Sequence, residues 1–319
     1  MKRLEEFIVE KLKISKIETK YHPNSKEELV DLIIKEIEAN GPECSLNHID
    51  VSNITDMSYL FRGAEPSQYY QGKTVLSDFD GDISKWNVSK VINMRSMFSD
   101  CNYSGKNGDI SNWSVSNVTD MRAMFARSKY NGDISNWDVS NVTNMSFLFQ
   151  DSVFTGKNGD ISNWDVSNVT NMSYMFDKSK YNGDISNWDV GNVTRMDSMF
   201  YGSKFNGNIS KWDVSSVRDM SEMFKTSKFT GEHGGISNWD VSSVRDMREM
   251  FGGSKFNGDI SNWDVSTVEM FNEMFRNSTF NGDISKWRIN PKAKGHMNKM
   301  FLKSPLGNNP PDWYYKYSK

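Results

Sequence analysis

Tandem repetition is the feature that most constrains what this chain can fold into. Each copy contains a version of one phrase, which residues 157–176 show as KNGDISNWDVSNVTNMSYMF. A unit this short cannot bury an apolar face alone, so copies must stack and share one continuous core. The repeat is marked by tryptophans spaced 24 or 27 residues apart, at Trp86, Trp113, Trp137, Trp164, Trp188, Trp212, Trp239, Trp263 and Trp287.

Each repeat contains two apolar periods. Trp164 and Val166 stand two residues apart, which is the alternation of a β-strand. Val169, Met172 and Met175 follow at spacings of three, which is typical of one face of a short helix. We therefore expect an α/β fold, a right-handed solenoid of leucine-rich-repeat type whose coils contain a strand, a turn and a short helix.

The spacing Ile161-x-x-Trp164-x-Val166 has the shape of a leucine-rich-repeat strand. Here the chain resembles the BspA-like leucine-rich repeat family, found in mycoplasma lipoproteins and Bacteroidales surface proteins. The resemblance covers about residues 51–301 and implies a surface or binding protein without known catalysis. Relatives that lack an export signal are encoded by gut bacteria and their tailed phages, so the resemblance also allows a phage origin.

We expect the segments outside the repeats to cover the two ends of the stack. The chain then divides into an N-terminal cap, 1–50, the repeats, 51–301, and a C-terminal cap or tail, 302–319. The first segment predicts two helices, one with an apolar stripe and one that begins at a capping box, Ser25 to Glu28, and ends at Gly41-Pro42. This segment is either a cap or a separate docking or oligomerisation module. The last segment contains Trp313-Tyr314-Tyr315, which either covers the end of the stack or serves as a docking peptide. The stripe of the first helix consists of Leu4, Phe7, Ile8 and Leu12.

Composition excludes several functional classes. With 38 basic and 41 acidic residues, the net charge of −3 argues against a nucleic-acid-binding protein. No run is long and apolar enough for membrane insertion, and no signal peptide is visible. We therefore expect a cytoplasmic or virion-associated protein rather than a secreted one.

The sequence contains no pattern that indicates catalysis or metal binding. The four histidines show no metal-ligand spacing, and no catalytic or nucleotide-binding motif occurs, so we expect no metal, no cofactor and no enzyme activity.

The methionines and tryptophans are expected to form the core. Met172 and Met175 stand three residues apart beside Phe176, and most other copies repeat this arrangement. Thioether groups pack well against aromatic rings, so we expect a flexible core against an inward-facing tryptophan column.

One polar column has an electrostatic consequence. The residue after the repeat tryptophan is usually aspartate, and stacking would place these carboxylates about 4.8 Å apart on the outside of the coils. Like charges at that spacing repel, so they need hydrogen bonds, raised pKa values, cations or a basic partner. We expect either hydrogen bonds from neighbouring coils or a face for a cationic, repetitive ligand. The column consists of Asp138, Asp165, Asp189, Asp213, Asp240 and Asp264.

The positions between the two repeat methionines vary more than the rest of the repeat. Phe147 and Tyr174 stand there in consecutive copies, and we expect them to form an exposed patch on the convex side. The sequence favours a non-catalytic scaffold for protein recognition or surface display. The alternative is a structural component of an assembly such as a virion. A glycan-binding or glycan-cleaving solenoid is a more distant alternative.

Overall fold

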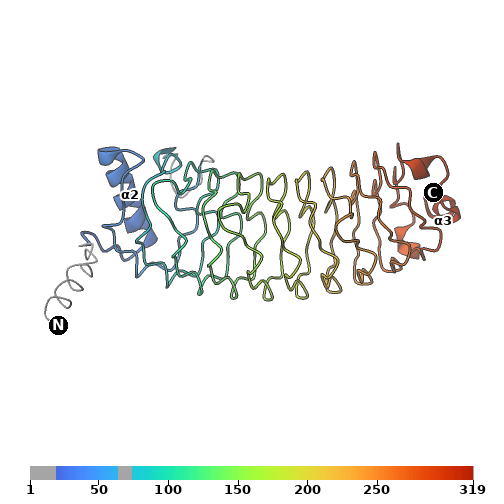
Figure 1. Ribbon diagram of the computed structural model, residues 1–319, viewed down its shortest axis with the longest axis horizontal. Helices are drawn as coiled ribbons and strands as arrows, with labels where there is room; N and C mark the ends of the chain where they lie inside the picture. The colour runs from blue at the N-terminus through green and yellow to red at the C-terminus, as the bar shows by residue number, and fades with distance from the viewer. Residues whose placement is uncertain (1–18, 64–73, 319) are drawn as a thin grey trace, which may run out of the picture.

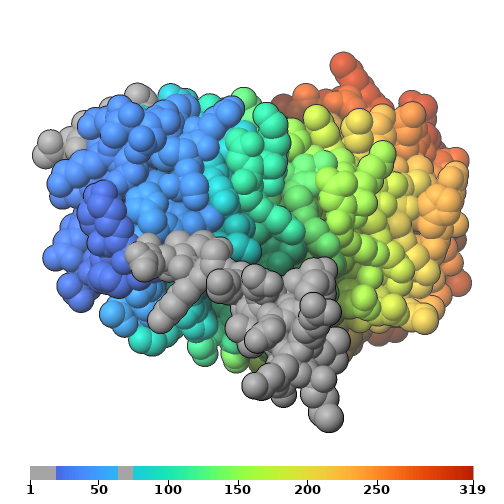
Figure 2. Space-filling model, turned by 60° about the vertical axis from the view of Figure 1, so that its left-hand side comes forward, coloured from blue at the N-terminus to red at the C-terminus, as the bar shows by residue number. Residues whose placement is uncertain are grey.

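The chain forms an elongated row of stacked coils in the computed structural model, which describes residues 19–63 and 74–318 (Figure 1). Helix α2 (Lys26–Asn40) lies at the N-terminal end of the row, and helix α3 (Asp312–Tyr317) lies at the C-terminal end. Seen from nearer the N-terminal end, the coils follow one another in chain order (Figure 2). Short 3₁₀ helices occur at Thr74–Leu76, Pro291–Ala293 and Pro305–Gly307.

The fold class expected from the sequence is wrong. The part of the chain that the structure describes has no extended β-strand and no sheet, and its two α-helices lie at the ends of the row. Turns and irregular segments form the coils, and isolated parallel β-bridges join neighbours, such as Asn144 with Asn171. The chain is therefore not an α/β solenoid of leucine-rich-repeat type.

The apolar spacing that predicted a short helix has a different backbone. Tyr174 has a φ of 58°, in the left-handed region, which interrupts a right-handed helix. The N–H of Met172 donates to the carbonyl of Arg195 in the next coil at 3.0 Å, whereas the N–H of Met175 donates to Met172 at 3.2 Å. This alternation of bonds between coils and within the turn places Met172, Met175 and Phe176 in the core without a helix.

The expected strand around Trp164 is also absent. Trp164 and Val166 are buried and Asp165 between them is exposed, as the alternation predicted. The main-chain bonds of this segment stay within one coil, because Trp164 donates to Ile161 at 3.2 Å and Val169 donates to Val166 at 2.9 Å. The two-residue alternation therefore marks a sequence of turns rather than a strand.

The short motifs that turn the chain consist mostly of Asp or Asn, an apolar residue and a serine. In the coil of Trp164 they are 160–162, 165–167 and 171–173. In each, the side-chain oxygen of the first residue accepts the serine N–H, at 3.0, 3.0 and 2.9 Å, which is an Asx turn. The middle residue of each motif is buried. The same three residues thus set the direction of the chain and supply its core.

The tryptophans of the repeat point into the core, as predicted from the sequence. All nine are only 3–4 % exposed. Each indole Nε1–H donates to an isoleucine or leucine carbonyl of the preceding coil, at 3.0–3.3 Å. A buried indole N–H without an acceptor is costly, so these bonds fix each coil against its neighbour.

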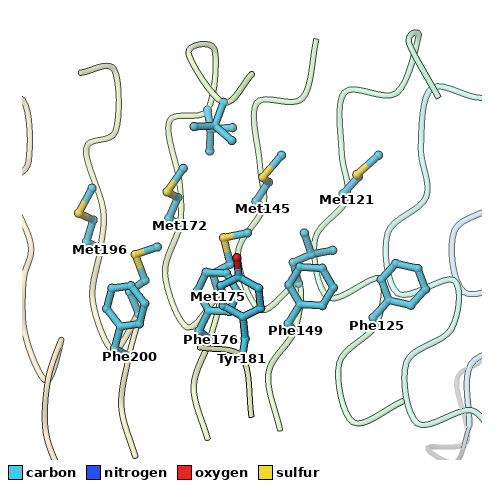
Figure 3. Packing of buried hydrophobic residues seen from close by; sticks show 14 of the residues in the cluster. Met121, Phe125, Met145, Phe149, Met172, Met175, Phe176, Tyr181, Met196 and Phe200 are labelled. Carbon is cyan, nitrogen blue, oxygen red and sulfur yellow. The ribbon is translucent and has the colours of Figure 1, made fainter. Parts of the chain in front are cut away.

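Methionine and phenylalanine side chains fill the rest of the core, which confirms the predicted thioether and aromatic packing. Phe149, Phe176 and Phe200 lie in one row with centroids 5.8 Å apart from coil to coil. A parallel row runs beside them (Figure 3) and consists of Met121, Met145, Met172 and Met196, all fully buried.

Helix α2 begins and ends as its sequence predicted. The Ser25 hydroxyl accepts the Glu28 N–H at 3.2 Å, and the Glu28 carboxylate accepts the Asn24 N–H at 2.8 Å. Gly41, with a φ of 84°, donates its N–H to Ile37 at 2.8 Å and ends the helix. Its buried face joins the core cluster. The expected helix with Leu4, Phe7, Ile8 and Leu12 lies outside the described residues.

Helix α3 brings one more indole into the column at the other end. Trp313 Nε1 donates to the Ile284 carbonyl at 2.9 Å, and its ring stacks on Trp287 at 6.2 Å. Tyr314 packs edge-on against Phe301 at 5.0 Å, while Tyr315 is 60 % exposed. The aromatic tail therefore lies on the end of the stack.

Candidate functional site

The six aspartates of the column lie exposed on the outside of consecutive coils. Each carboxylate accepts the backbone N–H of the residue two positions later, at 3.0–3.1 Å. In the coils of Asp138 and Asp165 the serine hydroxyl at that position also donates, at 2.6 Å. These hydrogen bonds therefore come from the same coil, whereas the sequence predicted them from neighbouring coils. The column consists of Asp138, Asp165, Asp189, Asp213, Asp240 and Asp264.

These bonds favour the ionised form of the carboxylates. The serine hydroxyl two residues later, followed by its N–H, lowers the pKa of Asp165 and likewise that of Asp213 and Asp264. Raised pKa values are therefore not how these three offset their mutual repulsion. A lowered pKa stabilises the fold above the ordinary value of the carboxyl, and this contribution is lost as pH falls through the lowered pKa.

We expect Ser167→Ala to raise the pKa of Asp165 toward its ordinary value, because it removes the hydroxyl that donates to the carboxylate. Carboxyl carbon chemical shifts followed by NMR between about pH 2 and 7 measure this pKa. Ser186→Ala is the control, since Ser186 belongs to a different turn, in which its backbone N–H donates to Asp184 rather than to Asp165. An unchanged pKa of Asp165 in Ser167→Ala would contradict the account.

The aspartates thus act in turns, and they are not gathered into a metal site. No group of three or more His, Cys, Asp or Glu side chains within 19–63 and 74–318 is arranged to hold a metal ion. Because the six consecutive coils from Asp138 to Asp264 repeat the same Asx turn, this side of the molecule has the same chemistry over those coils.

A second surface differs from coil to coil, and we call it the variable face. It comprises the positions equivalent to Ser173, Tyr174 and Asp177 in every coil, beside the main-chain bonds that join the coils. Every residue at the Tyr174 position has a φ between 52° and 62°. These residues are Tyr59, Ser96, Ala123, Phe147, Tyr174, Ser198, Glu222, Glu249, Glu273 and Lys299.

Phe147 and Tyr174, the predicted patch, lie together on the variable face. Their rings stack in parallel, with centroids 4.6 Å apart and an interplanar angle of 4°. Both are half-buried rather than fully exposed. Left-handed backbone is unfavourable for such residues, by about 1–2 kcal/mol each. Bonds from the Phe147 N–H to Ser173 and from the Tyr174 N–H to Asp197, both 2.9 Å, hold them there.

Ion pairs neutralise much of the rest of the variable face. Lys225 lies between Glu222 and Glu249, at 2.9 and 2.7 Å. Arg248 pairs with Asp246 at 2.6 Å. Toward the N-terminal end, by contrast, arginines surround the aromatic rings of Tyr59 and Phe147. Residue variation between the methionines pointed to this face, but the arginine cluster was missed.

These features define a tandem-repeat protein in which stacked coils share one core. The family model described as "Mycoplasma protein of unknown function, DUF285" matches residues 37–158, 151–235 and 205–313, and the chain belongs to this family. The mycoplasma-type repeat seen in the sequence is thereby confirmed, whereas its leucine-rich-repeat assignment is not supported. Comparison with curated proteins and with solved structures gave no match. Among the described helices, none is long and apolar enough to cross a bilayer.

Proposed function

We propose that this protein is a non-catalytic scaffold that recognises a protein partner through the variable face. The observation that carries the proposal is the contrast between two surfaces of the same coils. The aspartate side repeats one turn, whereas the variable face presents different side chains at regular intervals. Recognition of one partner requires different groups at defined positions, which only the second surface offers.

The composition and rigidity of the variable face support this proposal. Arginine and aromatic side chains are enriched at protein interfaces, and they dominate binding when they are partly buried. The Phe147 and Tyr174 rings form such a pair, and Arg122 lies over the Phe147 ring at 5.3 Å. Main-chain bonds to the next coil hold these positions, so little order has to be gained on binding.

The test is capture of the partner from the native source on immobilised protein, quantified by mass spectrometry. The variant to test is Phe147→Ser/Tyr174→Ser. It should fold, because serine already occupies the equivalent position in two other coils, as Ser96 and Ser198. Loss of two central aromatic side chains should reduce capture about tenfold or more.

The matched control changes the aspartate column. In Asp165→Asn/Asp189→Asn/Asp213→Asn the turns should persist, because Asn87 forms the same turn with the Ser89 N–H at 3.1 Å. Capture should be unchanged in this variant. Equal capture by the serine variant, or loss of capture in the asparagine variant, would contradict the proposal and favour the aspartate side.

A further inference from the structure

A pocket of about 230 Å³ lies at the N-terminal part of the variable face. Small residues at two consecutive coils, Ser96 and Ala123, separate the large rings of Tyr59 and Phe147, and this sequence of sizes leaves the hollow. Its described lining includes four arginines and no carboxylate. The volume is below that of pockets for drug-sized ligands, so it fits a small charged group rather than a whole organic molecule.

Three of these arginines have no carboxylate partner among the residues that the structure describes. Arg62 and Arg95 lie over the Tyr59 ring, at 5.4 and 5.6 Å, and Arg122 lies over Phe147. The fourth, Arg127, is neutralised by Asp100 through two hydrogen bonds of 2.5 and 2.7 Å. The pocket therefore has a net excess of positive charge.

A comparison within the chain shows that the Asp-Met dipeptide before Arg122 does not by itself prevent an ion pair. Arg122 and Arg248 both follow Asp-Met at the same position of the repeat. Arg248 turns back to Asp246, with bonds of 2.9 and 3.0 Å from Nε and a further contact of 2.6 Å. Arg122 has no such pair with Asp120 and extends over the ring of the next coil instead. The aromatic wall keeps this guanidinium available.

Arg62 adds a second observation about the pocket. Its Nε atom is buried and has no hydrogen-bond partner. Buried polar atoms are paired in the great majority of cases, so Arg62, which lines the pocket, has an unsatisfied donor. Planar guanidinium groups match phosphate oxygens with paired hydrogen bonds, and three cations match a dianion better than a single carboxylate charge.

We propose that this pocket binds a phosphate monoester, held by Arg62, Arg95 and Arg122. The inference deepens the proposed function and rests on it for the biological source of the group, because a partner that docks on the variable face would present the phosphate there. The pocket itself is defined by the arginines alone, so its binding can be measured without the partner.

The experiment is titration of the whole protein with inorganic phosphate by calorimetry at constant ionic strength, with acetate as a monoanionic comparison. We expect one saturable site for phosphate. Arg122→Ser should weaken binding roughly 10- to 100-fold, because it removes hydrogen bonds to a charged group. Serine already occupies this position in Ser146 and Ser173, so the variant should fold. Arg248→Ser, at the same position of the repeat and also after Asp-Met, should bind phosphate as the unchanged protein does.

Two further arms identify the source of the group. A phosphoserine peptide and glucose 6-phosphate carry the same monoester, and tighter binding of one over the other assigns the ligand to a protein or to a sugar. For either, binding should weaken below about pH 6, where the dianion becomes protonated. Absence of saturable phosphate binding, or an equal loss of affinity in Arg122→Ser and Arg248→Ser, would overturn the proposal that this pocket binds phosphate. Retained partner capture in that case would leave the proposed function standing, so the two failures are distinguishable.

Discussion

Trp188→Ala should lower the free energy of unfolding by about 3–5 kcal/mol, the range for removing a large buried aromatic side chain. Trp188 is 3 % exposed, and its ring packs at 6.2 Å from Phe176. The substitution also removes the 3.0 Å bond from Nε1 to the Ile161 carbonyl, which joins the two coils, and among the described residues leaves that carbonyl with only the Trp164 N–H at 3.2 Å. The loss falls in the middle of the stack, where coils on both sides depend on it.

Urea unfolding followed by circular dichroism measures this loss. Tyr315→Ala is the control, because Tyr315 is a 60 % exposed aromatic residue and should change stability by no more than about 0.5 kcal/mol. An unchanged unfolding midpoint in Trp188→Ala would contradict the inward placement of the indoles.

Gly81→Ala should lower the free energy of unfolding by about 1–3 kcal/mol, the range for overpacking a tight site. A Cβ atom at Gly81 would overlap the carbonyl oxygen of Cys44 in the preceding coil and come within 2.7 Å of the Phe79 ring. Backbone cannot swing away as a flexible side chain can. The same carbonyl accepts the Asp82 N–H at 3.1 Å, so relieving the overlap would strain a bond between coils.

Gly235→Ala is the matched control for this second prediction. A Cβ atom at Gly235 would meet nothing within 4 Å, and its backbone is outside the left-handed region. We expect no loss of stability, or a gain of about 0.4–1 kcal/mol from a less flexible unfolded chain. Similar losses in Gly81→Ala and Gly235→Ala, again from urea unfolding, would show that coil contact at Gly81 is not the cause.

The core could be predicted from the sequence because burial follows directly from the spacing of large apolar residues. Trp164, Val166, Met172 and Met175 are all buried as expected. The backbone conformation could not be predicted. Residues three positions apart face the same side in a helix, and they also do so in a turn that contains one left-handed residue. Glycine or asparagine usually marks that conformation, but Tyr174 and its equivalents carry almost any side chain. The recurring Asp-Val-Ser triplet was the available signal for turns.

The site was predictable only in part. Variation between the methionines indicated the variable face, and Phe147 and Tyr174 do lie together there. The arginine pocket was not predictable, because Arg122 and Arg248 both follow Asp-Met in sequence while the next coil presents a different residue to each. Phe147 faces the first, whereas the next coil after Arg248 has Glu273 at that position.

Hydroxyl-radical footprinting of the captured complex tests the central claim, that the variable face binds the partner. The aromatic side chains on this face, Tyr59, Phe147, Tyr174 and Tyr201, should become protected from oxidation when the partner is bound. Tyr315, on α3 at the end of the stack, should stay as reactive as in the free protein. Unchanged reactivity of the four side chains together with protection of Tyr315 would contradict the account and indicate assembly through the ends.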